Sequence, residues 1–172
     1  MRARLAVTRH TAGSTVFAQA RIVRQWLFLT DGIAASQQTR PDGTVTIARF
    51  FEADQICANL TSTWHQAEDA DDLIAITDVV GVLLPDSLLR GEYLGGGAFG
   101  AYLRLKIMET LLFDKELLCA KTSIQTAHRY RFLEDRHRAV IGQAPQKAIA
   151  RFLGITPQGL SRFLRQRRRA DA

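Results

Sequence analysis

The sequence predicts an α+β fold in which an antiparallel β-rich half precedes one long helix and a C-terminal helix-turn-helix. Short apolar runs separated by Asp-Gly turns between residues 13 and 85 predict the strands. Beyond Pro85, apolar residues recur at helical spacing instead. The formal net charge of +6 lies entirely in residues 143–172, which contain seven basic residues and one acidic residue, whereas residues 1–142 contain sixteen of each. A neutral body therefore carries a basic, helical end.

The clearest strand pairing in the β-rich half surrounds the Pro-Asp-Gly turn at residues 41–43. Proline presets the backbone that enters the turn, and glycine tolerates the positive φ that a tight hairpin needs. Residues 33–40 and 44–51 are therefore expected to pair. Two further strand-like runs occupy residues 73–84. These features predict a β-sandwich or barrel for this half of the chain.

A long helix is expected between Phe99 and Ala120, because apolar residues recur there with charged residues between them. Its apolar surface is too broad for a single buried stripe. A heptad-like row runs through this helix: Met108, Leu111, Lys115 and Leu118. Such a row favours contact with a partner helix, so these four residues form the predicted dimer interface. The alternative is a helix that is simply buried in the core of a monomer.

The remaining sequence predicts three further helices. Thr122 and Gln125 have the spacing of a capping box, which would open a helix through His137, with residues 139–144 as a short connection. Pro145 suits the first turn of a helix over residues 146–153, and Gly154 suits its end. Thr156 and the proline after it then cap and start a helix to about residue 167. Two short helices joined by a turn with glycine form a helix-turn-helix.

The basic end of the chain predicts binding to nucleic acid, because cationic side chains alternate there with apolar ones at helical spacing. On the second helix the outward positions are Gln158, Ser161, Arg162 and Arg165. Gln pairs well with adenine and Arg with guanine, so these outward positions can read bases. The predicted contacts to the DNA backbone are Gln146, Lys147, Thr156, Arg165 and Arg167. The alternative is a basic hairpin that only remains solvated.

The run from Ala144 to Arg162, APQKAIARFLGITPQGLSR, resembles the winged helix-turn-helix of the Crp/Fnr family of transcription regulators. A weaker resemblance to the cyclic-nucleotide-binding β-roll of that family extends through residues 27–32, 42–43 and 75–79. The resemblance implies three parts: a β-roll in residues 1–98, a dimerisation helix in residues 99–121 and a winged helix-turn-helix in residues 122–172. The wing strands would lie around residues 138–143.

The resemblance also implies a homodimer that binds double-stranded DNA at an inverted repeat, with half-sites ~34 Å apart. In that family the base-reading residues lie at the positions of Gln158, Ser161 and Arg162, which are therefore the predicted base-reading residues here. RNA polymerase is a candidate further partner. The sequence departs from the family at the phosphate-binding cassette, where residues 54–60 are followed by an acidic stretch containing Glu68, Asp69, Asp71 and Asp72. Because a cyclic phosphate needs a cationic partner, neither cyclic AMP nor cyclic GMP is an expected ligand.

The other motifs favour structural interpretations. Residues 95–100 match Gly-x-Gly-x-x-Gly without a βαβ context, so a flexible joint is preferred to a dinucleotide site. Cys57 and His65 are interpreted as a core thiol and an exposed imidazole rather than metal ligands. No metal or other cofactor is expected, and no catalytic pattern indicates an enzyme. The aromatic residues of the β-rich half either pack its interior shut or line a site for an apolar effector: Trp26, Phe28, Phe50 and Phe51.

Two cysteines and the lack of a long apolar run predict a soluble, cytoplasmic protein with no membrane association. The sequence therefore favours a dimeric, sequence-specific DNA-binding transcription regulator with a degenerate effector domain. The alternative is a ligand-binding or protein-interaction module whose basic C-terminus binds nucleic acid without specificity. Selection of a defined palindrome from random DNA separates the two.

Overall fold

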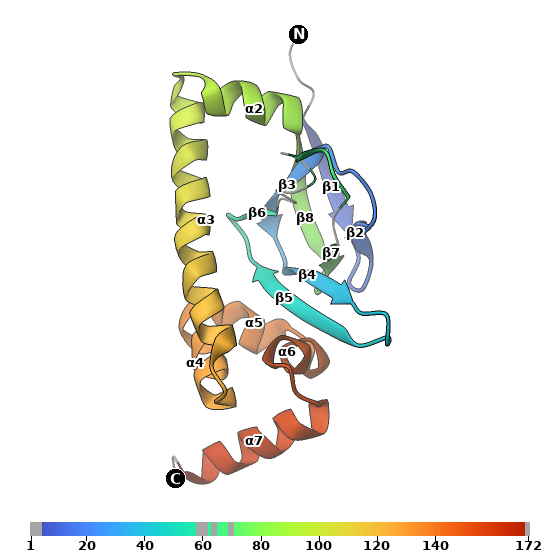
Figure 1. Cartoon of the computed structure of the whole chain (residues 1–172), viewed down its shortest axis with the longest axis vertical. Helices are drawn as coiled ribbons and strands as arrows, with labels where there is room; N and C mark the ends of the chain where they lie inside the picture. The colour runs from blue at the N-terminus through green and yellow to red at the C-terminus, as the bar shows by residue number, and fades with distance from the viewer. Residues whose placement is uncertain (1–4, 58–61, 63–64, 69–70, 171–172) are drawn as a thin grey trace.

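The computed structural model describes residues 5–57, 62, 65–68 and 71–170 as a β-roll flanked by helices (Figure 1). The strands are β1 (Ala6–His10), β2 (Thr15–Phe17), β3 (Gln25–Asp31), β4 (Ala34–Thr39), β5 (Val45–Phe51), β6 (Ile56–Cys57), β7 (Asp71–Ala75) and β8 (Val79–Pro85). The helices are α2 (Asp86–Leu94), α3 (Ala98–Thr122), α4 (Thr126–Arg136), α5 (Arg138–Gln143), α6 (Gln146–Leu153) and α7 (Pro157–Ala170). No helix among the described residues is long and apolar enough to cross a membrane.

The strands form two antiparallel four-stranded sheets with the orders β1-β8-β3-β6 and β2-β7-β4-β5. The predicted pairing of residues 33–40 with 44–51 is confirmed, since Ala34 faces Phe51 and Thr39 faces Val45 across β4 and β5. At the turn, Gly43 has a φ of 80°, and the carboxylate of Asp42 accepts a 2.8 Å hydrogen bond from the Thr44 N–H. The Pro-Asp-Gly signal therefore specified the hairpin by local chemistry alone.

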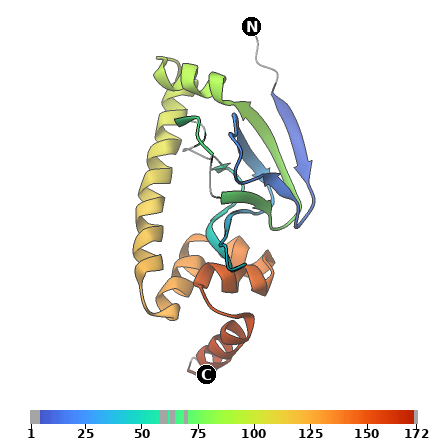
Figure 2. The same cartoon turned by 45° about the vertical axis from the view of Figure 1, so that its right-hand side comes forward.

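Helices α4 to α7 gather at the end of the molecule opposite α2, and α3 runs between the two ends (Figures 1 and 2). A single apolar cluster joins this helical end to the β-roll. It contains Ala35, Ile47 and Phe50 from the strands, Ile33 from the turn before β4 and, from the helices, Leu117, Tyr130, Leu133, Val140, Ala148, Ile149, Ala150, Phe152, Leu153 and Leu160. The β-roll and the helix-turn-helix thus share one core.

Two of the expected helix boundaries are wrong. Thr122 does not cap a new helix: it ends α3, where its hydroxyl donates to the carbonyls of Leu118 and Cys119. This bond to the preceding turn competes with capping, so α4 begins only at Thr126. Residues 138–143, expected as the place of the wing and overlapping the connection expected at residues 139–144, form α5 instead. After β8, the described residues include no strand.

The glycine-rich segment before α3 is a packed corner, whereas a flexible joint was expected. It follows α2, a helix that the sequence analysis did not anticipate. A Cβ on Gly100 would lie 2.1 Å from the carbonyl oxygen of Glu92, so the corner requires a residue without a side chain. Arg104 also donates hydrogen bonds to the carbonyls of Tyr93 and Gly95, at 2.7 and 2.9 Å. These contacts fix the direction in which α3 leaves α2.

Candidate nucleic-acid interface

The turn between α6 and α7 is built by local backbone chemistry. Gly154 has a φ of 67°, in the left-handed region that favours glycine, and ends α6 as expected. The Ile155 N–H then donates to the carbonyl of Ala150 at 3.1 Å. Thr156 caps α7, because its hydroxyl oxygen accepts a 3.0 Å hydrogen bond from the Gly159 N–H. The predicted helix-turn-helix is therefore present, with α7 as its second helix.

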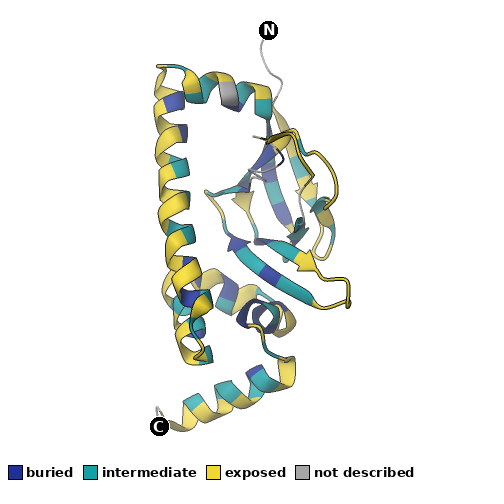
Figure 3. Ribbon diagram, viewed as in Figure 1, coloured by how far each residue is buried: buried dark blue, intermediate teal, exposed yellow. Residues whose placement is uncertain are grey.

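One face of α7, here called the reading face, consists of the exposed residues Gln158, Arg162, Arg165 and Arg169. Their spacing of four, three and four places them on one side of a helix. Among the described residues, neither Arg162 nor Arg165 takes part in an ion pair (Figure 3 shows the exposure along α7). Ser161 lies beside this face and is half-buried. The reading face therefore presents unneutralised guanidinium groups to solvent.

The predicted backbone contacts divide into two groups. Gln146 and Lys147 are exposed at the start of α6, and Thr156 is exposed at the start of α7 while it also caps that helix. Arg167 lies on the side of α7 that faces α4. Its guanidinium is 2.8 Å from the carboxylate of Glu134 and 5.3 Å from the ring centre of Tyr130. The structure thus separates Arg167 from Arg165, although the sequence grouped them.

The outward side of α3 is apolar and exposed along most of the helix (Figure 3). All four residues of the predicted dimer row are exposed: Met108, Leu111, Lys115 and Leu118. A second heptad row, which the sequence analysis missed, is also exposed, and we call it the outer row: Ala101, Leu105, Met108, Leu112, Lys115 and Cys119. Alternation of four and three along this row is the signal that identifies it. Leu111 and Leu118 lie to one side, where they also border a cavity.

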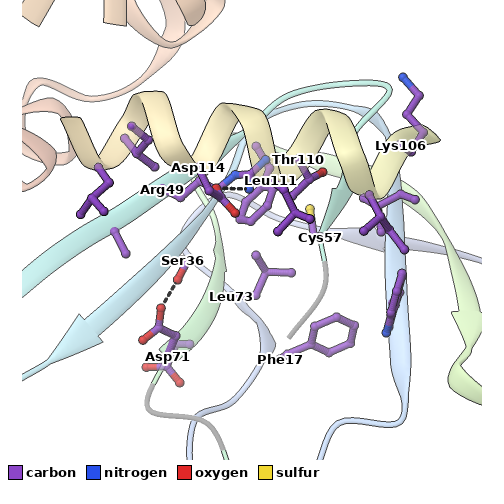
Figure 4. Close-up of a pocket in the computed structure, with 18 of the residues that line it drawn as sticks. Phe17, Ser36, Arg49, Cys57, Asp71, Leu73, Lys106, Thr110, Leu111 and Asp114 are labelled. Carbon is purple, nitrogen blue, oxygen red and sulfur yellow. Dashed lines mark hydrogen bonds and ion pairs between the residues drawn. The ribbon is translucent and has the colours of Figure 1, made fainter. Parts of the chain in front are cut away.

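That cavity, of about 420 Å³, lies between α3 and the β-roll (Figure 4). Its lining residues come from β2 to β7 and from α3: Phe17, Trp26, Ser36, Ala48, Arg49, Phe51, Ile56, Cys57, Asp71, Asp72, Leu73, Lys106, Ile107, Thr110, Leu111, Asp114, Leu117, Leu118 and Lys121. Of the aromatic residues singled out in the sequence, Trp26 and Phe51 are buried and border this cavity. Phe50 is fully buried in the core shared with the helices.

Two charged groups of the cavity wall, Arg49 and Asp114, pair with each other. Arg49 forms a 2.6 Å ion pair with Asp114 and lies 4.7 Å from the ring centres of Phe51 and Phe113. Burial lowers the pKa of Arg49 and raises the pKa of Asp114, and in each case it outweighs the attraction within the pair. Burial likewise raises the pKa of the Cys57 thiol, so this sulfur stays protonated. The described residues include no cluster with the makeup of a metal site.

The junction of the β-roll with the helical end contains two residues that the sequence analysis did not single out. His137 is fully buried between α4 and α5, and its Nδ1 lies 3.4 Å from a carboxylate oxygen of Glu52. Lys121, in the last turn of α3, donates a 2.5 Å hydrogen bond to the carbonyl of Ile47 and lies 4.5 Å from the ring centre of Phe152. Burial lowers the pKa of Lys121 to about 8.

Solved structures with this fold include transcription regulators. FixK2 from Bradyrhizobium japonicum matches with a TM-score of 0.78 and 16% identity over 95% of this chain and 84% of that one. TTHB099, a CRP-family transcriptional regulator from Thermus thermophilus, matches with a TM-score of 0.72 and 13% identity, over 95% of this chain and 85% of that one. The c-di-GMP-responsive global regulator CLP from Xanthomonas campestris matches with a TM-score of 0.69 and 11% identity, over 97% of this chain and 88% of that one. No protein-family model and no curated protein matches the sequence.

These similarities define the class of fold: a cyclic-nucleotide-binding-type β-roll joined through a long helix to a C-terminal helical domain of the DNA-binding type. The Crp/Fnr-type architecture that the sequence resembles is therefore confirmed for this chain at the level of the fold.

Proposed function

We propose that this protein is a sequence-specific, DNA-binding transcription regulator that binds an inverted-repeat operator as a homodimer. The observation that carries the proposal is the reading face of α7, where exposed Gln158, Arg162 and Arg165 project from the second helix of a helix-turn-helix. Such a helix fits the major groove, where Arg pairs with guanine and Gln with adenine. Solved structures that share this fold over nearly the whole chain include transcription regulators, which supports a non-enzymatic role.

The contacts divide by chemistry. Gln158, Ser161 and Arg162 read bases, and Arg162 supplies the largest base contact because its guanidinium is exposed and unpaired among the described residues. Lys147 and Arg165 contact phosphates, as do the helix starts at Gln146 and Thr156. Arg167 has a different task in the free protein, since its ion pair with Glu134 holds α7 against α4. Its phosphate contact requires that this pair open.

The homodimer forms through the outward side of α3. Met108, Leu105 and Leu112 of the outer row are each more than half exposed, which is unusual for a contiguous apolar strip in a protein that remains a monomer. Two parallel copies of α3 bury this strip and place their two α7 helices on the same side of the assembly. Two-fold symmetry then makes the operator an inverted repeat with half-sites ~34 Å apart.

The β-roll does not bind a cyclic nucleotide in this proposal. Of the basic groups that the structure describes in the cavity wall, Arg49 is paired with Asp114, Lys106 is paired with Asp54 and Glu109, and Lys121 donates to the carbonyl of Ile47. A cyclic phosphate would have to break one of these contacts to obtain a cationic partner. A regulator of this type works in the compartment that holds the DNA, the cytoplasm, and RNA polymerase is a further candidate partner.

The test is selection of bound duplexes from a random-sequence pool, combined with sedimentation of the free protein. A palindromic motif selected by a protein of twice the chain mass supports the proposal. Equal binding to all duplexes, with no motif, would instead favour a ligand-binding or protein-interaction module whose basic end attaches to nucleic acid without specificity. Titration with cyclic AMP and cyclic GMP in the same buffer examines the effector domain, and saturable binding of either nucleotide would contradict the degenerate cassette.

A further inference from the structure

We propose that the cavity between the β-roll and α3 binds an uncharged, mostly apolar small molecule, and that Lys121 carries the effect of its occupancy to the helix-turn-helix. The first part concerns the cavity alone. The second part rests on the proposed function, because its readout is DNA binding. Lys121 belongs both to the cavity wall and to the contact between β5 and α6.

Size and surface chemistry favour a small apolar occupant. The volume of about 420 Å³ falls within the ordinary range of small-molecule sites. Most of the lining is aliphatic or aromatic, and Figure 4 shows Phe17 and Leu73 across the cavity from Leu111. Cys57 adds a thiol that burial keeps neutral. On binding, an apolar ligand and the apolar cavity wall would both exchange contacts with water for contacts with each other, which is favourable.

Charge pairing within the wall argues against a charged occupant. Among the residues that the structure describes, the wall contains three cations, Arg49, Lys106 and Lys121, and three carboxylates, Asp71, Asp72 and Asp114. Asp114 is paired with Arg49, and the carboxylate of Asp71 accepts the hydroxyl of Ser36, as the dashed lines in Figure 4 mark. A ligand of either sign would meet repulsion from one set of these groups and would have to break pairs already made.

The other three charged groups are also engaged, and one of them, Lys121, donates to the carbonyl of Ile47. Asp72 accepts a 2.7 Å hydrogen bond from the Gln19 N–H, and Lys106 points away from Phe17 and Leu73 toward its partners outside the cavity (Figure 4). The described part of the wall therefore carries as many cations as carboxylates. This balance separates the site from one that clamps an anion, in which unpaired donors converge on the ligand.

Lys121 connects the cavity to α6 in one step. Its ammonium holds the carbonyl of Ile47 on β5 and lies over the ring of Phe152 on α6. Phe152 in turn packs against Phe50, with ring centres 5.4 Å apart. An occupant that displaces the Lys121 side chain changes both contacts at once. The contacts of Lys121 thus give a direct physical link between occupancy of the cavity and the packing of α6 on β5.

The first experiment uses two fluorescent probes with the same aromatic scaffold. N-phenyl-1-naphthylamine is uncharged, and 8-anilino-1-naphthalenesulfonate adds one sulfonate. We expect saturable binding of the uncharged probe, one per chain, at least tenfold tighter than that of the sulfonate. Ala48→Phe and Thr110→Phe, which fill the cavity from β5 and from α3, should each weaken binding of the uncharged probe at least tenfold. Leu112→Ala on the outer row is the control and should leave it within twofold.

Equal or tighter binding of the sulfonate would overturn the assigned ligand class. Loss of probe binding in Leu112→Ala, with none in the two filling variants, would place the probe on the outer side of α3 and overturn the site. Two filling variants on different elements are used so that a folding defect in one, seen by circular dichroism, leaves the other to decide.

The second experiment measures affinity for a selected duplex with and without saturating N-phenyl-1-naphthylamine. We expect a change of at least fivefold in the wild type and less than twofold in Lys121→Met, with each protein saturated by probe according to its own titration. An unchanged coupling in Lys121→Met, or no coupling in the wild type, would overturn the role of Lys121. Absence of duplex binding under both conditions would contradict the proposed function instead, while the probe titrations would still decide the ligand class.

Discussion

Helices α3 and α7 each leave one face exposed, and the chemistry of the two faces is opposite. The outer row of α3 presents Leu105, Met108 and Leu112 to solvent, whereas the reading face of α7 presents Arg162 and Arg165. Both helices also have an inner face that packs within the chain. Leu103 and Leu117 of α3 are buried, and Leu160 of α7 is fully buried.

The difference shows what kind of partner each helix lacks. Exposed apolar area is relieved by another apolar surface, and the regular heptad spacing of the outer row suits a second copy of the same helix. Exposed guanidinium groups without acidic partners suit a polyanion. Assembly and DNA binding should therefore be separable by mutation, and each prediction below alters one face while the other is measured.

The largest effect is expected from charges on the outer row. Leu105→Glu combined with Leu112→Glu should convert the dimer to a monomer in sedimentation, because like charges would meet across the two-fold axis. Affinity for an inverted repeat should then fall by about 10²–10⁴-fold, since the two half-sites are no longer bound together. Val7→Glu, at an exposed position on β1 with 67% of its surface accessible, is the control. A dimer that survives the double substitution would contradict the assignment of this face.

The inner face of α3 should respond in stability rather than in assembly. Leu103 is 1% exposed and packs with Trp26, Leu84 and Leu89, so Leu103→Ala should lower the free energy of unfolding by about 2–5 kcal/mol. Denaturant titration measures this loss. Leu94→Ala, at a leucine that is 81% exposed, should change it by no more than about 0.5 kcal/mol. Similar losses in both variants would remove the distinction between the two environments.

Arginines on opposite sides of α7 should differ in DNA binding. Arg162→Ala should cost about 1–3 kcal/mol at the selected operator and relax one base position. Arg167→Ala loses the ion pair with Glu134, so it should affect all sequences alike and lower stability slightly. Competition binding against single-base operator variants distinguishes the two. A uniform loss for Arg162→Ala would show that this residue touches phosphate only.

The smallest effect concerns the pH dependence of stability at Lys121. Its pKa is lowered to about 8 in the folded protein by burial, whereas in the unfolded chain it lies near the ordinary value of about 10.4. Below pH 8 Lys121 is charged in both states, so the cost of burying its ammonium lowers the free energy of unfolding in full. This cost is relieved as the pH rises from 8 toward 10.4, because the folded state then holds fewer protons than the unfolded state. The stability of wild type relative to Lys121→Met should rise over this interval in urea titrations. A constant difference would mean that Lys121 titrates normally.

Local chemistry in the sequence determined several parts of this protein. The hairpin at residues 41–43 follows from glycine and an Asp side chain that bonds within the turn. The helix-turn-helix follows from Gly154 at the end of α6 and from the Thr156 cap, each of which acts within five residues. The reading face follows from helical periodicity, because a helix with one buried side necessarily exposes the other.

Where a local signal competed with another, sequence reasoning was wrong. Thr122 and Gln125 have capping-box spacing, but the Thr122 hydroxyl bonds to the preceding turn of α3. The segment expected to contain the wing forms α5, whose Val140 is fully buried in the shared core. In both cases the residue pattern allows two local structures, and packing against distant elements decides between them.

Only the tertiary structure decided the cavity, the balance of charge in its wall and the place of Lys121. The bond from Lys121 to Ile47 spans 74 positions of the sequence, and the ion pair between Arg49 and Asp114 spans 65. No periodicity or turn signal relates residues so far apart. Sequence thus determined which surfaces need a partner, through the chemistry of each helix face, whereas the fold determined which buried groups meet, because only packing brings distant side chains together.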